Sequence, residues 1–165
     1  MLAPALGWGA RRMFCSGCGS GLSPEQYLNI PIDQCGSCGG VWLEEGRLKW
    51  IIEVGPKSLP DERVKEATRF VISPGTSYRL GENDTLRVVK CPYCISVMRP
   101  VNYSASSGVA IYKCINDHGV WVPKGGIDRL VIFIDTWERY LKTHAPYFAS
   151  LAQLERKRFL RKLSF

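Results

Sequence analysis

The sequence predicts a small, metal-stabilised α+β fold, built as two copies of one unit and followed by a basic tail. Three observations predict it. Six of the seven cysteines form three Cys-x-x-Cys pairs, one cysteine-rich pattern occurs twice, and positive charge gathers near the C-terminus. A chain of 165 residues can form one domain or two small ones. Units below about 70 residues rarely bury enough apolar surface to be stable without a covalent or metal cross-link.

The cysteines define the two units. The first unit reads CSGC at 15–18 and CGSCGGVWL at 35–43, and the second reads CPYC at 91–94 and CINDHGVWV at 114–122. Two such turns separated by 15 to 20 residues are typical of zinc sites. Each turn holds its thiolates on one side of a tight bend, and a β-hairpin between the turns lets them face each other around a tetrahedral ion.

The second unit lacks one cysteine, which leaves its fourth ligand to be identified. Aligned on Gly-Val-Trp, Asp117 falls opposite Cys38, whereas His118 falls one position later. Structural zinc sites use Cys and His, and an imidazole reaches farther than a thiol, so chemistry favours His118. The predicted ligands are Cys15, Cys18, Cys35 and Cys38 in site 1, and Cys91, Cys94, Cys114 and His118 in site 2, with Asp117 as the alternative. We expect two Zn²⁺ per chain; thiolates alone also suit a rubredoxin-like iron site.

The hairpins and helices follow from local patterns. In the second unit, residues 97–103 and 109–114 read as strands joined by a polar turn containing Gly. In the first unit, residues 27–34 read as the returning strand, and Pro31 suggests a sheet edge. Short runs at 86–90 and 59–70 predict a strand and a connector helix.

A helix is predicted after each Val-Trp. Leu48, Ile51 and Ile52 mark a short one that ends at Gly55-Pro56. Apolar residues recur at helical spacing from Ile127 to Leu141 and predict a long one. On its other side lie Ile132, Phe133 and Tyr140, and we expect Phe133 and Tyr140 to remain partly exposed for a partner. The two turns and hairpin of each unit form a ribbon. Trp42 and Trp121 are each expected to pack this ribbon against its own helix.

These elements divide the chain into five parts. We predict an N-terminal extension (1–14), ribbon 1 with its helix (15–55), a structured connector (56–86), ribbon 2 with its long helix (87–145) and a basic C-terminal helical tail (146–165).

The paired turns and the segment GVWLEEGRL at 40–48 resemble the zinc-finger domain of the transcription-factor-IIB type, a zinc ribbon. The resemblance covers roughly 15–52 and 91–134. It implies that the four cysteines of the first unit bind one zinc, and that the three cysteines of the second carry over directly. The second unit departs from the pattern at Pro123, which stands where the first has Glu44. The family implies a metal-stabilised module and little chemistry.

We expect a protein that is not an enzyme. Eight ligands fill two four-coordinate sites and leave no open position for water or substrate, and no nucleophile, phosphate-loop or paired-carboxylate motif is present. The predicted function is a structural subunit that contacts protein subunits of a larger organellar or ribonucleoprotein assembly. The alternative is a nucleic-acid-binding or transcription-associated factor that contacts RNA or DNA through the cations of the tail. These cations are Arg156, Lys157, Arg158, Arg161 and Lys162.

The compartment follows from the cysteines and the N-terminus. An odd cysteine count and the lack of a secretory signal in the first thirty residues favour an intracellular reducing compartment. Arg11 and Arg12, with no acid before Glu25, favour the mitochondrion over cytoplasm or nucleus. No apolar run approaches the ~18 residues that span a bilayer, so no integral membrane association is expected.

Overall fold

The fold is described from a computed structural model that covers residues 13–55, 59–69, 80, 87–105 and 107–144. Most of the N-terminal extension, with Arg11 and Arg12, and all of the basic tail, with its five cations, lie outside the described residues.

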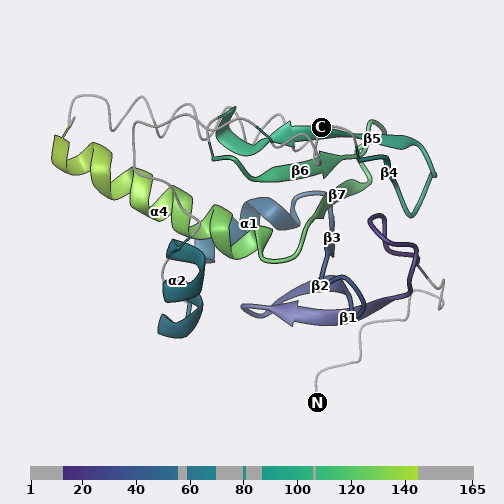
Figure 1. The fold of residues 1–165 in the computed structure, drawn as a ribbon, viewed down its shortest axis with the longest axis horizontal. Helices are drawn as coiled ribbons and strands as arrows, with labels where there is room; N and C mark the ends of the chain where they lie inside the picture. The colour runs from purple at the N-terminus through teal and green to yellow at the C-terminus, as the bar shows by residue number, and fades with distance from the viewer. Residues whose placement is uncertain (1–12, 56–58, 70–79, 81–86, 106, 145–165) are drawn as a thin grey trace, which may run out of the picture.

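The described residues form one antiparallel sheet of seven strands (Figure 1). The strands are β1 (Leu22–Tyr27), β2 (Ile30–Cys35), β3 (Val41–Glu44), β4 (Val89–Lys90), β5 (Val97–Asn102), β6 (Ala110–Lys113) and β7 (Gly119–Val122). Their order across the sheet is β1-β2-β3-β7-β6-β5-β4. The two units therefore contribute opposite halves, and β3 and β7 meet in the middle. The hairpin of residues 97–114 has the strands that the sequence predicts.

The first hairpin differs in detail from the prediction. Residues 27–34 are not one strand, because Leu28 and Asn29 have φ of 50° and 64° and form a two-residue turn. Successive positive φ values are typical of the hairpin turn that matches strand twist. Nor does Pro31 mark an edge strand, since β2 pairs with β1 on one side and β3 on the other. Pairing with β3 is confined to Asp33 and Gln34, so the missing N–H of Pro31 breaks no bond with β3.

The junction of the two units is centred on the tryptophans. Trp42 pairs with Trp121, while Val41 pairs with Val122 and Leu43 with Val120. Because Trp121 is the repeat equivalent of Trp42, this register relates the units by a local two-fold axis through the tryptophan pair. The duplicated chain thus contains an internal, self-complementary interface.

The helices cover one face of this sheet. They are α1 (Arg47–Val54), α2 (Asp61–Thr68) and α4 (Gly126–His144), with a short 3-10 turn at Tyr103–Ala105. One apolar core joins this face to α1 and α4. It contains Ile32, Leu43, Ile111 and Val122 from strands, Ile51 and Ile52 from α1, and Leu130, Val131 and Ile134 from α4. In the described ranges, no helix is long and apolar enough to cross a membrane.

The tryptophans lie on the opposite face, so the expectation that each seals a ribbon against its own helix is wrong. Successive side chains of a strand point to opposite faces. Val41 and Leu43 face the helices, and Trp42 between them joins a second core with Trp121 and the cysteines. Both indoles are almost completely buried there.

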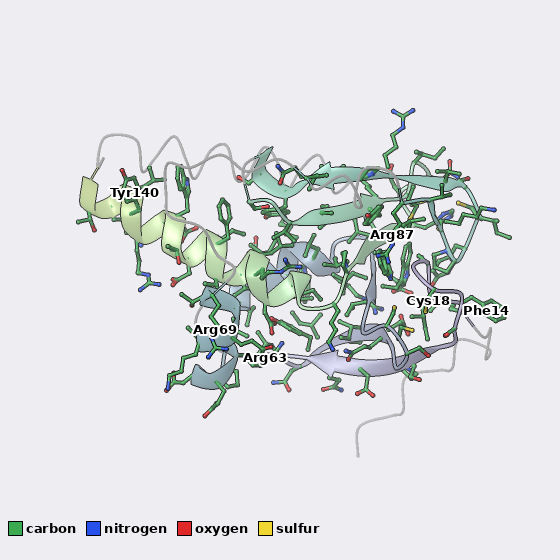
Figure 2. The ribbon with its side chains drawn as sticks, in the orientation of Figure 1. Phe14, Cys18, Arg63, Arg69, Arg87 and Tyr140 are labelled. Carbon is green, nitrogen blue, oxygen red and sulfur yellow. The ribbon has the colours of Figure 1, made fainter. Side chains whose placement is uncertain are left out.

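The long helix also departs from expectation at Phe133. This side chain is only 7% exposed and belongs to the helix-side core, and Ile132 is 5% exposed. Tyr140, labelled on α4 in Figure 2, is half-buried and stacks against Trp137 with 6.0 Å between ring centroids. The described face of α4 therefore does not offer Phe133 to a partner.

A polar cluster ties the connector helix α2 to both units. The Tyr27 hydroxyl donates to Asp128 Oδ1 at 2.5 Å, and Arg63 Nε donates to Asp128 Oδ2 at 3.0 Å. The Arg63 guanidinium also lies 4.6 Å from the centroid of the Tyr27 ring, and Figure 2 shows it on the side of α2 that faces the sheet. Burial and the neighbouring Asp128 carboxylate raise the pKa of Tyr27, which keeps it a donor. The cluster joins β1, α2 and α4.

A substitution at Gly119 tests the pairing of β3 with β7 at the junction of the two units. A Cβ at this position would lie 2.1 Å from the Leu43 carbonyl oxygen, and its φ of 147° already disfavours a side chain. We expect Gly119→Ala to lower the free energy of unfolding by about 2 to 3 kcal/mol, because the β3–β7 ladder has to open. Thermal unfolding of the zinc-loaded chain followed by circular dichroism measures this. Gly36→Ala is the control, since no atom lies within 4 Å of its added Cβ, and a change above about 0.5 kcal/mol there would contradict the interpretation.

Candidate metal centres

The first four cysteines form a compact cluster between two turns. Their sulfur atoms all lie within 4.8 Å of one another. The Cys15 and Cys38 sulfurs are 3.5 Å apart, and so are those of Cys18 and Cys35. Zn–S bonds of about 2.3 Å imply S···S separations of about 3.8 Å in a tetrahedron. The cluster therefore fits a four-thiolate zinc ion.

The turns that carry the cysteines share one construction. In three of the turns the backbone N–H two residues after the leading cysteine donates to its sulfur at 3.4 Å, from Gly17 to Cys15, from Tyr93 to Cys91 and from Asn116 to Cys114. In three turns the fifth residue has a left-handed backbone, with φ of 79° at Gly19, 69° at Gly39 and 61° at Ile95. This residue turns the chain back after the second ligand. Hydrogen bonds to sulfur and the reversed backbone hold the pair of thiolates on one side.

In the fourth turn, which begins at Cys114, the left-handed residue comes one position earlier than in the other three turns. Its left-handed residue is Asp117, with φ of 54°, in the register position of Cys38. The outer closure is kept, because Cys114 N donates to Gly119 O at 3.0 Å as Cys35 N donates to Gly40 O at 2.9 Å. Early reversal at Asp117 moves His118 into the ligand position. The shift in register that separates the two candidates is thus absorbed by backbone conformation.

His118 closes the second cluster. Its Nδ1 lies 3.5 Å from the Cys114 sulfur and 3.8 Å from the Cys91 sulfur. The Cys94 and Cys114 sulfurs are 3.5 Å apart, and all four ligand atoms lie within 4.8 Å of one another. The carboxylate of Asp117 instead pairs with Lys113 Nζ at 3.1 Å. The alternative fourth ligand is therefore occupied elsewhere, and the group is Cys₃His.

Each tryptophan lies against the metal cluster of the other unit. A Cβ added to Gly17 or Gly40, both beside the first cluster, would lie 2.2 or 2.5 Å from the Trp121 ring. Trp42 in turn lies 5.9 Å from the ring centroid of Tyr93 in the second unit. Glycine is needed at both positions because the Trp121 indole of the other unit occupies the space that a side chain would take. The two metal sites thus share one buried wall.

Tyr93 links the second metal centre to the first unit, and the sequence analysis did not identify this residue. Its ring stacks on His118 at 5.6 Å and 18°, and its hydroxyl donates to Glu44 Oε1 at 2.8 Å. Glu44 also pairs with Arg47 at the start of α1. Burial and the hydrogen bond to Glu44 raise the pKa of Tyr93 to about 12. Glu44, the acid after Val-Trp-Leu, therefore belongs to the junction of the two units. The second unit has Pro123 at this position, so it has no equivalent hydrogen bond to the first unit.

In the absence of metal, the local environment gives the thiols of each cluster different pKa values. Burial raises the pKa of Cys38 and Cys91 to about 12 and also raises that of Cys15. Hydrogen bonds from Ser20 lower the pKa of the exposed Cys18 to about 6, and those from Ser96 and Asn116 lower that of Cys94 to about 5. Each centre therefore presents one ready thiolate to an incoming cation, whereas the buried thiols release protons as the metal binds. Four thiolates with Zn²⁺ carry a formal charge of −2, and Cys₃His carries −1.

Four cysteines on two turns that a β-hairpin joins are the arrangement of a zinc ribbon. Residues 14–54 match a family model described as a transcription factor zinc-finger, so the predicted resemblance is confirmed for the first unit. No curated protein matched the chain, and no solved structure did. The chain thus contains a zinc-binding zinc-ribbon domain and a second group able to hold zinc.

The fourth ligand can be tested by paired substitutions. We expect His118→Ala to lower the zinc content from two to one per chain and to unfold the second ribbon, because structural zinc supplies roughly 10 to 16 kcal/mol in small modules. Inductively coupled plasma mass spectrometry and circular dichroism measure both effects. Asp117→Ala should keep two zinc ions and lose only the pair with Lys113. One zinc in Asp117→Ala and two in His118→Ala would contradict the assignment.

Zinc affinity at the first site should fall as the pH falls. The pKa of Cys38 is raised to about 12 and that of Cys15 above 9.0, so both thiols are protonated near neutral pH in the absence of metal. Binding displaces at least these two protons, and apparent affinity should drop about a hundredfold for each pH unit below 8. Competition with a chromophoric chelator between pH 6 and pH 8 measures this slope. A pH-independent affinity would show that the buried thiols are already ionised.

Proposed function

We propose that this protein is a non-catalytic, zinc-stabilised subunit that supports a larger protein assembly. The observation that carries the proposal is the closed nature of both centres. Each has four protein ligands and is walled by a tryptophan of the other unit. A catalytic zinc keeps a position open for water or substrate, whereas a structural zinc does not.

The shape of the molecule supports a scaffold. Metal cross-links, the β3–β7 ladder and the Tyr27–Asp128–Arg63 cluster join both ribbons and the helices α2 and α4 into one unit. Such a body can hold surface groups in fixed positions without rearranging when it binds. Large apolar side chains remain exposed on it, and exposed apolar surface is typical of interaction sites. Trp50 on α1 is 65% exposed, and Phe14 points into solvent beside Cys18 in Figure 2.

Nucleic-acid binding is the second candidate, and the charge distribution favours it. The formal net charge is +7, and residues 129–165 supply +5 of it. Neutralising phosphates with such cations gives binding that weakens steeply with salt. This candidate depends on the tail, which lies outside the described residues. The proposed assembly role and a contact with RNA are compatible in a ribonucleoprotein, and the mitochondrion is the compartment we propose for it.

Purification of the tagged full-length chain from its native source distinguishes the two. We expect protein subunits to co-purify in fixed ratio and to remain after nuclease treatment, and a variant that lacks residues 154–165 should keep them. Quantitative mass spectrometry with RNA detection measures both. Loss of all partners on nuclease treatment or on removal of the tail would favour the nucleic-acid function. A monomer that captures neither class would contradict both.

A further inference from the structure

We propose that the outer face of the second ribbon's tip is the docking surface for a segment of a partner protein that combines aliphatic and acidic side chains. This face, here the tip face, consists of Val88, Lys90, Ile95, Val97, Arg99 and Ile115. The inference rests on the proposed function, because it identifies where the assembly contact lies and what chemistry the partner has.

The strand residues of the tip face lie on one side of the sheet, and its other residues follow or precede them directly in the chain or lie in the adjoining turn. Lys90 of β4 pairs directly with Val97 of β5, and Arg99 of β5 pairs with Lys113 of β6. Strand alternation places Lys90, Val97 and Arg99 on the face opposite Val89 and Met98, which are buried in the cysteine core. The turns that carry Ile95 and Ile115 adjoin each other at the metal site, because Asn116 Nδ2 lies 3.3 Å from the Cys94 sulfur and 3.4 Å from Ser96 Oγ.

Its aliphatic side chains are open to solvent. Val88 is 69% exposed, Ile95 70%, Val97 55% and Ile115 59%. The same face of the sheet is covered farther along the strands, where Ile111 and Val109 belong to the core with α4. Four branched aliphatic groups are thus exposed at this end of the sheet, where the helix cover has ended, and exposed apolar surface of this kind is typical of interaction sites.

The first ribbon is an internal control for what the fold requires. Its residues at the positions of Ile95, Val97 and Ile115 are glycines, namely Gly19, Gly21 and Gly36. Ser23 and Gln34 stand at the positions of Arg99 and Lys113. At these five positions the metal-binding turns of the first unit therefore form without an aliphatic or cationic side chain, whereas Arg12 and Phe14 stand at the positions of Val88 and Lys90. What distinguishes the second tip is chemistry that the fold does not need.

Ile95 strengthens this comparison through its backbone. It has φ of 61°, and the equivalent Gly19 has φ of 79°. Left-handed backbone suits glycine and is a clear outlier for a β-branched residue. A strained isoleucine that is 70% exposed contributes little to the core of this chain. Contact with a partner is the role that remains for its side chain.

The charges select the partner. Lys90 and Arg99 are both exposed, and no ion pair involves either of them within the described part of the chain. Lys113, beside Arg99, already pairs with Asp117. Arg87 is turned to the other face, 5.4 Å from the Trp121 ring centroid, and Figure 2 labels it there. Two unpaired cations around an aliphatic patch complement a segment in which carboxylates flank apolar anchors.

The same composition argues against nucleic acid on this face. Single-stranded nucleic acids bind to aromatic platforms on which bases stack. The tip face has aliphatic groups instead, and the neighbouring Tyr93 ring is already stacked on His118. Its affinity should come from burying branched side chains, with charge supplying orientation.

Selection from a displayed library of random 12-residue peptides tests the tip face on the full-length, zinc-loaded chain. We expect enriched peptides to combine Leu, Ile or Val with Asp or Glu. The double variant Ile95→Gly, Ile115→Gly installs the residues of the first ribbon, so it should fold and keep two zinc ions. Its affinity for the selected peptides should be at least about tenfold lower, as measured by fluorescence anisotropy.

Three further variants or probes complete the experiment. Lys90→Glu with Arg99→Glu should weaken acidic peptides at least about tenfold, and Trp50→Ser, which removes an exposed aromatic group elsewhere, should leave binding unchanged. Enrichment of no peptide, enrichment of basic peptides, or equal binding by the glycine variant would overturn the proposal. So would tight binding of a 20-nucleotide poly(U) probe that the glycine variant loses. Native complexes that persist in the glycine variant would leave the assembly function standing and remove this face from it.

Discussion

The pairing of β3 with β7 is the interaction on which the rest of the structure depends. It brings Trp42 opposite Trp121 and makes two small hairpins into one sheet. A ribbon of about forty residues cannot bury both faces of its own strands. Joining the copies gives each face a cover, with helices on one side and the tryptophans and metal clusters on the other. Backbone pairing at the junction therefore decides what every other element packs against.

Metal binding and this junction reinforce each other. Each zinc cluster fixes two turns, and the turns supply the glycines and the tyrosine against which the other unit's tryptophan rests. Loss of one metal would disorder the turns on which the tryptophan of the other unit packs. The two centres are thus coupled through packing, with Tyr93 and Glu44 as a polar bridge between them. Neither unit is therefore stabilised by its own contacts alone.

The internal duplication also shows where the two halves differ in sequence. Residues that the shared fold requires recur in both units, such as the Gly-Val-Trp segment and the first pair of cysteines. Residues at the tips do not recur, because solvent-exposed positions beyond the metal ligands are free to differ. Ile95 against Gly19 is the clearest case, since the backbone favours glycine in both. A difference that works against local conformational preference is informative about function.

Much of this protein was determined by the sequence alone. Cysteine spacing identified both clusters, and apolar periodicity placed α1, α4 and the second hairpin, because these signals are local in the chain. Tertiary structure decided the rest. From the sequence, either His118 or Asp117 could be the fourth ligand of the second site. The left-handed backbone at Asp117 decides the choice, because it moves His118 into the ligand position. The face to which Trp42 points, the burial of Phe133 and the bridge from Tyr93 to Glu44 depend on which segments meet across the sheet. Those contacts join residues far apart in the chain, and no local pattern encodes them.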